Sequence, residues 1–243
     1  MKIIEERIAQ RRDELARLPF FAFVEDDSLP PRERLAFAPY LAFFVMGFGD
    51  FNKYLLRDLD SNDPWQQVIN EHTREDDHHW RWYLDDLRKL ERARVLPFTD
   101  VLRFLWAEHT SKARQFLYRL CGLVHGADPR LRLAITQAVE GTGWVFFDGV
   151  AAAARSFTEE TGMQLTYFGH FHMERETGHV MASGEALHAV EQLVLPEALR
   201  PAALEAVDLV FAAARAFIEE VWDNVQRDRR ESENARRQAV APA

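Results

Sequence analysis

The chain has 243 residues, enough for one domain with a sizeable core, and its few glycines (11) and prolines (10) favour long helices over many short strands. Its formal net charge of −9 argues against nucleic-acid binding, because phosphate backbones are also negative. The single cysteine, Cys121, excludes an intrachain disulfide and suits a reducing cytoplasm.

Helical periodicity runs through nearly the whole chain, and proline and capping residues mark where the helices begin. The predicted helices cover about residues 2–17, 31–58, 64–92, 99–122, 128–157, 163–181 and 200–229. The longest apolar stretch, residues 35–49, is shorter than the ~18 residues that span a bilayer, so we interpret it as part of a buried helix and expect no membrane partner. We therefore expect an all-α, seven-helix bundle as a single domain over residues 1–230, with a disordered polar tail at 231–243.

The first of two histidine-rich clusters lies in the predicted third helix. Glu71 and His78 are seven residues apart, a spacing that returns a helix to within about 20° of the same face. Glu75 lies between them, and Glu75-x-x-His78 is itself a helical metal-binding spacing, so Glu75 could replace or supplement Glu71. Three other histidines fall off the predicted ligand faces, and we expect them to be exposed or to surround the site: His72, His79 and His170.

The second cluster places His172, Glu176 and His179 at positions i, i+4 and i+7 of a predicted helix, which is one helix face. Between the two clusters stands Glu140, in a long aliphatic and aromatic run where a free carboxylate would be costly to bury. A metal ion is the natural partner for it. The candidate metal ligands are therefore Glu71, His78, Glu140, His172, Glu176 and His179.

The charge balance of these six residues suits a pair of divalent ions. Three carboxylates and three neutral imidazoles would leave a residual charge of about +1, with room for a hydroxide or an anionic substrate. Mixed imidazole and carboxylate ligation with open positions fits non-haem iron or manganese better than structural zinc. Nearby tryptophan, tyrosine and phenylalanine residues would keep the site dry, as oxidative chemistry requires.

The order and spacing of these residues resemble those of the haem-oxygenase-like di-iron oxidases, whose pattern is Glu-x6-His, then Glu, then His-x3-Asp/Glu-x2-His. The family includes a chlamydial para-aminobenzoate-synthesis protein and an alkene-forming fatty-acid decarboxylase. The resemblance covers most of the chain in helix order. This chain supplies the six positions with Glu71, His78, Glu140, His172, Glu176 and His179.

The resemblance implies a seven-helix haem-oxygenase-like fold that holds no haem and binds two iron ions (Fe2+/Fe3+), with manganese as the other candidate. It also implies a dioxygen-activating oxidoreductase in which Glu71, Glu140 and Glu176 are catalytic as metal ligands. The partners would be O2 and a small organic substrate such as an amino acid, an amine or a fatty acid, and a homodimer is one assembly to test. The reaction would be N-oxygenation, desaturation or oxidative C–C cleavage. A carboxylate substrate would need a basic partner, for which the candidates are Arg74, Arg81 and Arg175.

Other interpretations stay open. A true haem oxygenase uses a proximal histidine on its first helix, and this chain has no histidine before His72. A thiaminase-like enzyme needs a catalytic cysteine, and Cys121 has no matching context. A metal-free helical interaction protein is the non-enzyme alternative. A ferritin-like di-iron protein without an organic substrate is the nearest rival, and its ligands would be Glu75, His78, Glu140, Glu176 and His179, with Glu108 as a further candidate.

Overall fold

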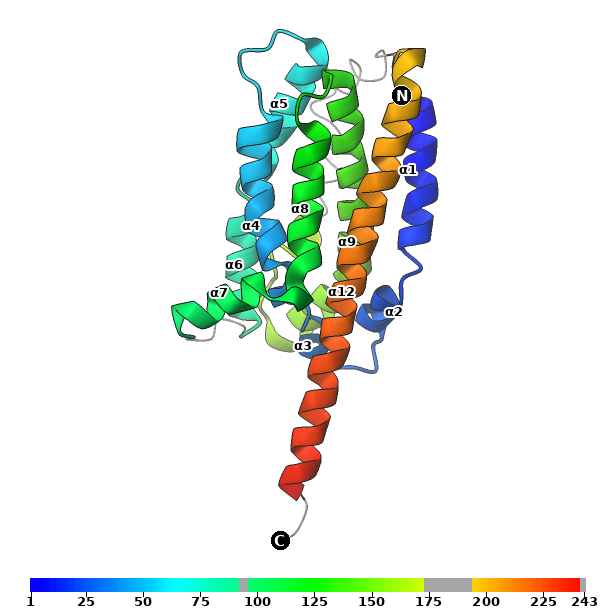
Figure 1. The fold of residues 1–243 in the computed structure, drawn as a ribbon. Coiled ribbons are helices and arrows are strands. Elements are labelled where there is room, and N and C mark those ends of the chain that lie inside the picture. The colour runs from blue at the N-terminus through cyan, green and yellow to red at the C-terminus, as the bar shows by residue number, and fades with distance from the viewer. Residues whose placement is uncertain (92–95, 173–193, 241–243) are drawn as a thin grey trace.

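The computed structural model describes residues 1–91, 96–172 and 194–240 (Figure 1). Within those ranges the chain forms helices and no strand, so the predicted all-α class is confirmed. Two of the predicted metal ligands, Glu176 and His179, lie outside the described residues.

The N-terminal part of the chain forms more and shorter helices than predicted. Helix α1 (Lys2–Leu15) matches the first predicted helix, and α2 (Pro19–Glu25) follows it after a short turn. The single helix predicted over 31–58 is instead divided into α3 (Pro31–Arg34), a 3-10 turn (Ala38–Leu41), α4 (Ala42–Phe51) and a π-helical turn (Asn52–Leu56). Pro39 lies in the 3-10 turn and has no backbone N–H to donate, which is one reason why the α-helix is interrupted there.

Taken as one stretch, residues 31–56 are long and apolar enough to cross a membrane by length and composition alone. Half of the most apolar window in this stretch is buried inside the bundle, where Leu35, Phe37 and Phe51 belong to the core. Core segments of folded proteins often pass the same test, so the composition of this stretch is weak evidence for a membrane span.

Two of the remaining helices begin at aspartates that cap their first turn. Asp63 accepts hydrogen bonds from the backbone N–H groups of Trp65 and Gln66, and Asp128 accepts one from Arg130. The helix that begins after Asp128 ends at Gly162, whose φ of 73° is the left-handed conformation that glycine adopts without strain. The remaining helices are α5 (Pro64–Asp76), α6 (Trp80–Lys89), α7 (Phe98–Trp106), α8 (Ser111–Val124), α9 (Pro129–Thr161) and α12 (Arg200–Val240).

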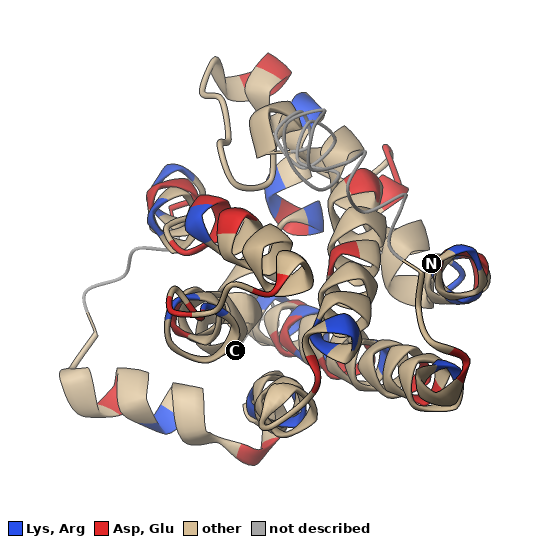
Figure 2. Ribbon diagram, turned by 90° about the horizontal axis from the view of Figure 1, so that it is seen from above, with Lys and Arg blue, Asp and Glu red and all other residues tan. Residues whose placement is uncertain are grey.

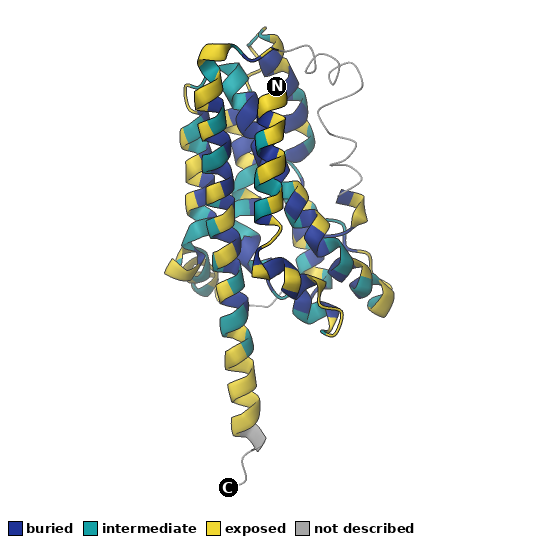
Figure 3. Cartoon of the chain, turned by 90° about the vertical axis from the view of Figure 1, so that its right-hand side faces the viewer, coloured by how far each residue is buried: buried dark blue, intermediate teal, exposed yellow. Residues whose placement is uncertain are grey.

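Viewed from above, the helices pack side by side, and acidic and basic residues are spread over them (Figure 2). Helix α9 is the centre of their contacts. It packs against α1, α2, α3, α5, α8 and α12. Helix α12 covers one side of α9 and then continues beyond the other helices, where its surface is exposed (Figure 3). The tail that the sequence predicts as disordered from residue 231 is therefore helical as far as Val240.

Small residues on α9 let neighbouring helices approach it closely. A Cβ atom at Gly149 would overlap the ring of Phe21 on α2, and that ring already packs edge-on against Phe20 with 5.3 Å between ring centroids. A Cβ atom at Gly141 would lie 2.8 Å from Ile8 of α1. Both glycines are buried, so these two helix contacts depend on the missing side chains.

We expect Gly149→Ala to lower the free energy of unfolding by about 1–3 kcal/mol, because overpacking outweighs the gain in helix propensity. The control is Gly122, an exposed residue of α8 whose added Cβ would have no heavy atom within 4 Å. Gly122→Ala should raise the free energy of unfolding by up to ~1 kcal/mol. Urea unfolding followed by circular dichroism measures both changes, and equal effects in the two variants would contradict the close approach of α2.

Candidate metal centre

The inward face of α5 begins apolar and ends polar. Trp65, Val68 and Ile69 are buried at its N-terminal end, with the spacing of one helix stripe. The same stripe continues to His72 and Asp76, which are each only 5 % exposed. The hydrophobic packing that docks α5 against α9 therefore carries an imidazole and a carboxylate into the interior.

Helix α5 ends at Asp76, and a turn over residues 77–79 separates it from α6, although the sequence predicts one helix over 64–92. Arg57 stabilises the end of α5. Its Nη2 donates to the backbone oxygen of Thr73 and to Oδ2 of Asp77, both at 2.7 Å. Gly49 of α4 lies against this turn, because a Cβ there would be 3.1 Å from the Asp77 carbonyl oxygen. Distant residues thus hold the turn that leads to His79.

His72 lies between two carboxylates from different helices. Its Nε2 atom is 3.2 Å from Oδ2 of Asp76 and 3.2 Å from Oε1 of Glu140, which belongs to α9. One donor atom from each of the three residues lies within 4.8 Å of the other two. Such a group of nitrogen and oxygen donors is of the right size to hold one metal ion.

Two further imidazoles adjoin this group. Nδ1 of His79 lies 3.7 Å from Oδ1 of Asp76 and 3.1 Å from Nε2 of His172. Nδ1 of His172 lies 2.8 Å from the backbone oxygen of Tyr167. Since a carbonyl oxygen can only accept, Nδ1 of His172 carries the proton, and its Nε2 offers a lone pair towards His79. We call the five residues the donor cluster: His72, Asp76, His79, Glu140 and His172.

Aromatic rings enclose the imidazoles of the donor cluster. The ring of His79 stacks on Trp82 with 4.2 Å between centroids, and Phe147 meets the ring of His172 at 4.1 Å. His72, His79 and His172 are all buried, whereas the Glu140 side chain is 28 % exposed. Solvent therefore reaches the cluster from the Glu140 side.

The charges in the cluster depend on one another. Burial lowers the pKa of His72, but the negative charges of Asp76 and Glu140 outweigh it and raise that pKa well above its ordinary value. Burial likewise raises the pKa of Asp76, and the charge of His72 outweighs it and lowers that pKa. In the absence of another cation, a proton on His72 would offset one of the two carboxylate charges.

The hydrogen bonds of the buried donor atoms are incomplete. Neither ring nitrogen of His72 nor Oδ1 of Asp76 makes a hydrogen bond with any part of the chain that the structure describes. A buried ion pair is stable only when its remaining polar atoms are hydrogen-bonded. A metal ion held between these atoms would complete their interactions.

The structure brings together two of the six ligands predicted from sequence, Glu140 and His172. Glu71 and His78 are partly exposed and do not belong to the three-residue donor group, and Nδ1 of His78 lies 3.4 Å from Oδ1 of Asp77. Glu176 and His179 fall outside the described residues. The ligand roles of these four residues stay predictions.

His72 and His79, which the sequence analysis placed off the ligand face, are buried members of the cluster. The signal that identifies them is the stripe of Trp65, Val68 and Ile69, because His72 continues it and Glu71 is rotated by about 100° from His72. A seven-residue spacing fits the pair at 72 and 79 as well as the pair at 71 and 78. The apolar stripe, and not the spacing, therefore decides which pair faces inward.

Asp86 of α6 holds the segment that leads to His172. It is fully buried, and its two carboxylate oxygens accept the backbone N–H groups of Thr166, Tyr167 and Phe168 at 2.7–3.0 Å. Burial raises the pKa of Asp86 even though these hydrogen bonds favour the charged form. Residues 163–169 are consequently irregular and a helix begins only at 170, whereas the sequence predicts a helix from residue 163.

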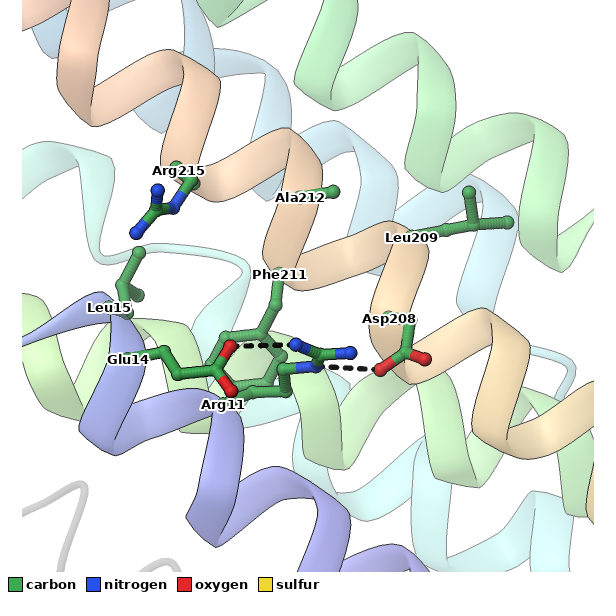
Figure 4. Close-up of a pocket in the computed structure, with 8 residues that line it drawn as sticks. All are labelled: Arg11, Glu14, Leu15, Asp208, Leu209, Phe211, Ala212 and Arg215. Atoms are coloured by element: carbon green, nitrogen blue, oxygen red, sulfur yellow. Dashed lines mark hydrogen bonds and ion pairs between the residues drawn. The ribbon is translucent and has the colours of Figure 1, made fainter.

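A hollow of about 620 Å³ lies away from the donor cluster, between α1 and α12 (Figure 4). Arg11 donates to Glu14 at 2.7 Å and to Asp208 at 2.8 Å, and these hydrogen bonds raise the pKa of Arg11 above its ordinary value. No imidazole or thiol is among the described residues that line the hollow. Its charged groups join two helices, so the donor cluster is the better candidate for chemistry.

We expect Asp86→Asn to lower the free energy of unfolding by about 2 kcal/mol, because an amide cannot accept all three buried N–H groups. Asp85 is the matched control, since it is 41 % exposed and pairs only with Arg88 and Lys89 of its own helix. Asp85→Asn should change the free energy of unfolding by less than about 1 kcal/mol. Chemical denaturation measures both, and a loss in Asp86→Asn no larger than that in Asp85→Asn would contradict the role assigned to Asp86.

Neither a model of a known protein family nor a curated protein matches the chain. The resemblance to the di-iron oxidases is thus carried by the spacing of the six predicted ligands and stays a prediction. The chemistry of the donor cluster is the remaining basis for a functional assignment.

Proposed function

We propose that the chain is a metal-dependent, dioxygen-activating oxidoreductase that holds iron at the donor cluster and acts on a small organic substrate. The observation that carries this proposal is the convergence of His72, Asp76 and Glu140, whose donor atoms lie within 4.8 Å of one another between α5 and α9. Imidazole and carboxylate ligands with open positions are typical of non-haem iron oxygenases. Structural zinc sites are closed and usually contain thiolates, and Cys121 lies elsewhere, on α8.

Iron at this site would supply the one-electron chemistry of dioxygen, which side chains cannot perform alone. His72, Asp76 and Glu140 would hold the ion, with His79 and His172 as further ligands. This proposal takes His72 and His79 in place of Glu71 and His78, because the former pair is buried beside the two carboxylates.

The surrounding residues have distinct tasks in this proposal. The backbone oxygen of Tyr167 fixes the tautomer of His172, so that Nε2 faces the cluster. Phe147 and Trp82 exclude water from the imidazoles. Glu140 is the partly exposed member, so it is placed to exchange protons with solvent.

The described donors are sufficient for one ion. A second iron, as the resemblance implies, would need ligands from elsewhere in the chain, and Glu176 and His179 are the residues we propose for it. If His172 completes this second site together with Glu176 and His179, His172→Ala should remove about one of two iron ions per chain. The number of iron ions bound per chain therefore tests the two-metal form of the proposal separately from the site itself.

Ligand variants and their sequence neighbours test the position of the site. We expect His72→Gln and Asp76→Asn each to weaken iron binding at least about 100-fold. Loss of a group that only supports a metal ligand weakens binding about 10–100-fold, so loss of a ligand itself should weaken it more. Glu71→Gln and His78→Gln should keep iron binding within about twofold. Iron content after anaerobic loading and desalting measures all four, and circular dichroism checks that each variant is folded.

Two results would contradict the proposed ligand set. If Glu71→Gln or His78→Gln loses iron while His72→Gln keeps it, the ligands suggested by sequence spacing are correct. If the unaltered chain binds no iron at all, the metal-dependent function is wrong.

Oxygen uptake tests the proposed chemistry. The chain loaded anaerobically with Fe2+ and then exposed to O2 should consume O2 and oxidise its iron, and Asp76→Asn should reduce this uptake in proportion to its lost iron. An oxygen electrode and a ferrous-specific chelator measure the two quantities. A loaded chain that binds iron stably without consuming O2 would exclude dioxygen activation and leave a metal-binding protein.

A further inference from the structure

Two cavities of about 80 Å³ each adjoin one another beside α9. The first, which we call the cluster chamber, is lined by Asp76, His79, Glu140 and His172. The second, which we call the apolar chamber, lies among residues of α4, α8, α9 and α12. The residues that line both are Phe44, Val45, Thr142, Gly143, Phe147 and Tyr167. The two chambers are therefore the polar and apolar ends of one elongated cavity.

The two ends differ in chemistry. The apolar chamber is walled by aliphatic and aromatic side chains such as Leu41, Phe116 and Phe217, and no charged residue is among its described lining. The hydroxyl of Thr142 already donates to the backbone oxygen of Val139 at 2.7 Å. Desolvating a polar group in this chamber would be costly, so its occupant is apolar.

No lysine or arginine is among the described residues that line either chamber. Arg74 and Arg81, two candidates for binding a substrate carboxylate, are exposed, and Arg175 lies outside the described residues. Among the described lining residues, a head group that enters the cluster chamber meets two carboxylates and two imidazoles. An amine suits this environment, because it can compensate the negative charge or offer its lone pair to a metal.

The face of α9 that lines the cavity carries Glu140, Gly143 and Phe147, at helical spacings of three and four residues. Gly143 lines both chambers, and a Cβ atom built on it would have no heavy atom within 4 Å. Gly143 therefore faces open space where the chambers join, and a side chain there would narrow the passage.

The size of the apolar chamber indicates how much of an apolar tail it can bury. About 80 Å³ is roughly half the volume of a protein cavity that holds benzene, so the chamber takes about three or four carbon atoms. A tail that also crosses the passage beside Gly143 gains one or two carbon atoms more. Carbon atoms beyond this length would lie outside the chamber and add little to binding.

We infer that the elongated cavity binds a small amine with an unbranched apolar tail of about three to six carbon atoms, the amine in the cluster chamber and the tail in the apolar chamber. The inference rests on the proposed function only for the metal that the amine meets. The binding of the tail depends on the apolar chamber alone.

Titration calorimetry with n-alkylamines tests the inference on the full chain, both metal-free and loaded with Mn2+ under anaerobic conditions. Affinity should rise by up to about fourfold for each methylene from ethylamine to butylamine, as expected for burial of each CH₂, and should level off beyond hexylamine. Butanoate should bind the metal-free chain at least about tenfold more weakly than butylamine. An affinity independent of tail length, or tighter binding of butanoate to the metal-free chain, would overturn the inference.

Gly143→Leu should weaken butylamine binding at least about tenfold and change ethylamine binding by less than about twofold, because the added side chain fills the passage and not the cluster chamber. Gly143→Ala, which adds one carbon, should fall between this variant and the unaltered chain. Gly122→Leu on the exposed face of α8 is the control and should bind both amines normally. Butylamine binding that is unchanged in both Gly143 variants would overturn the assignment.

These outcomes separate this inference from the proposed function. Gly143 contributes no metal ligand, so its variants should bind as much Mn2+ as the unaltered chain. If the chain binds no metal but still selects amines by tail length, the chamber is correct and the metal function is wrong. If the metal binds and tail length has no effect on amine affinity, the metal site is correct and the assignment of the apolar chamber is wrong.

Discussion

The interaction that most constrains this bundle is the approach of the buried Asp76 and the partly exposed Glu140 to His72, where α5 meets α9. Removing charged groups from water costs several kcal/mol for each ion, and mutual attraction repays this cost only when hydrogen bonds are complete. The hydrogen bonds of His72 and Asp76 are incomplete within the described residues. The bound cation that we propose would complete the interactions of these atoms.

Helix α9 has to satisfy two opposite requirements. On the sides that meet α1 and α2, Gly141 and Gly149 remove side chains so that Ile8 and Phe21 can pack against the helix backbone. On the side that meets α5, Glu140 brings a carboxylate to the donor cluster, and Gly143 leaves space next to it. The absence of a side chain therefore allows close helix packing on one side of α9 and leaves a cavity on another.

Local signals in the sequence predict much of the fold. Asp63-Pro64 and Asp128-Pro129 mark the starts of α5 and α9, and Gly162 marks the end of α9, because caps and prolines act on the backbone within a few residues. The inward position of Glu140 follows from the apolar run around it. The separation of α5 from α6 is not predictable in this way, since the contacts that stabilise it come from Arg57 and Gly49.

The candidate site was predicted in part for a similar physical reason. Glu140 is predicted because a carboxylate buried in an apolar run needs a partner, and His172 is predicted from its helical spacing to Glu176 and His179. The choice between His72 and Glu71 depends on the rotation of α5, which is set by Trp65, Val68 and Ile69 through their burial against the rest of the bundle. Ligand spacing does not depend on that rotation, so a seven-residue spacing fits the pair at 71 and 78 and the pair at 72 and 79 equally well.

The irregular backbone before His172 is itself a condition for the cluster. In a continuous helix from residue 163, the carbonyl oxygen of Tyr167 would accept the N–H of the residue four positions later. Because Asp86 instead binds the backbone N–H groups of residues 166–168, that oxygen accepts Nδ1–H of His172. The hydrogen bond leaves the lone pair of His172 on Nε2, which lies 3.1 Å from His79. One buried carboxylate on α6, far from any ligand role, thereby determines which nitrogen of His172 the donor cluster receives.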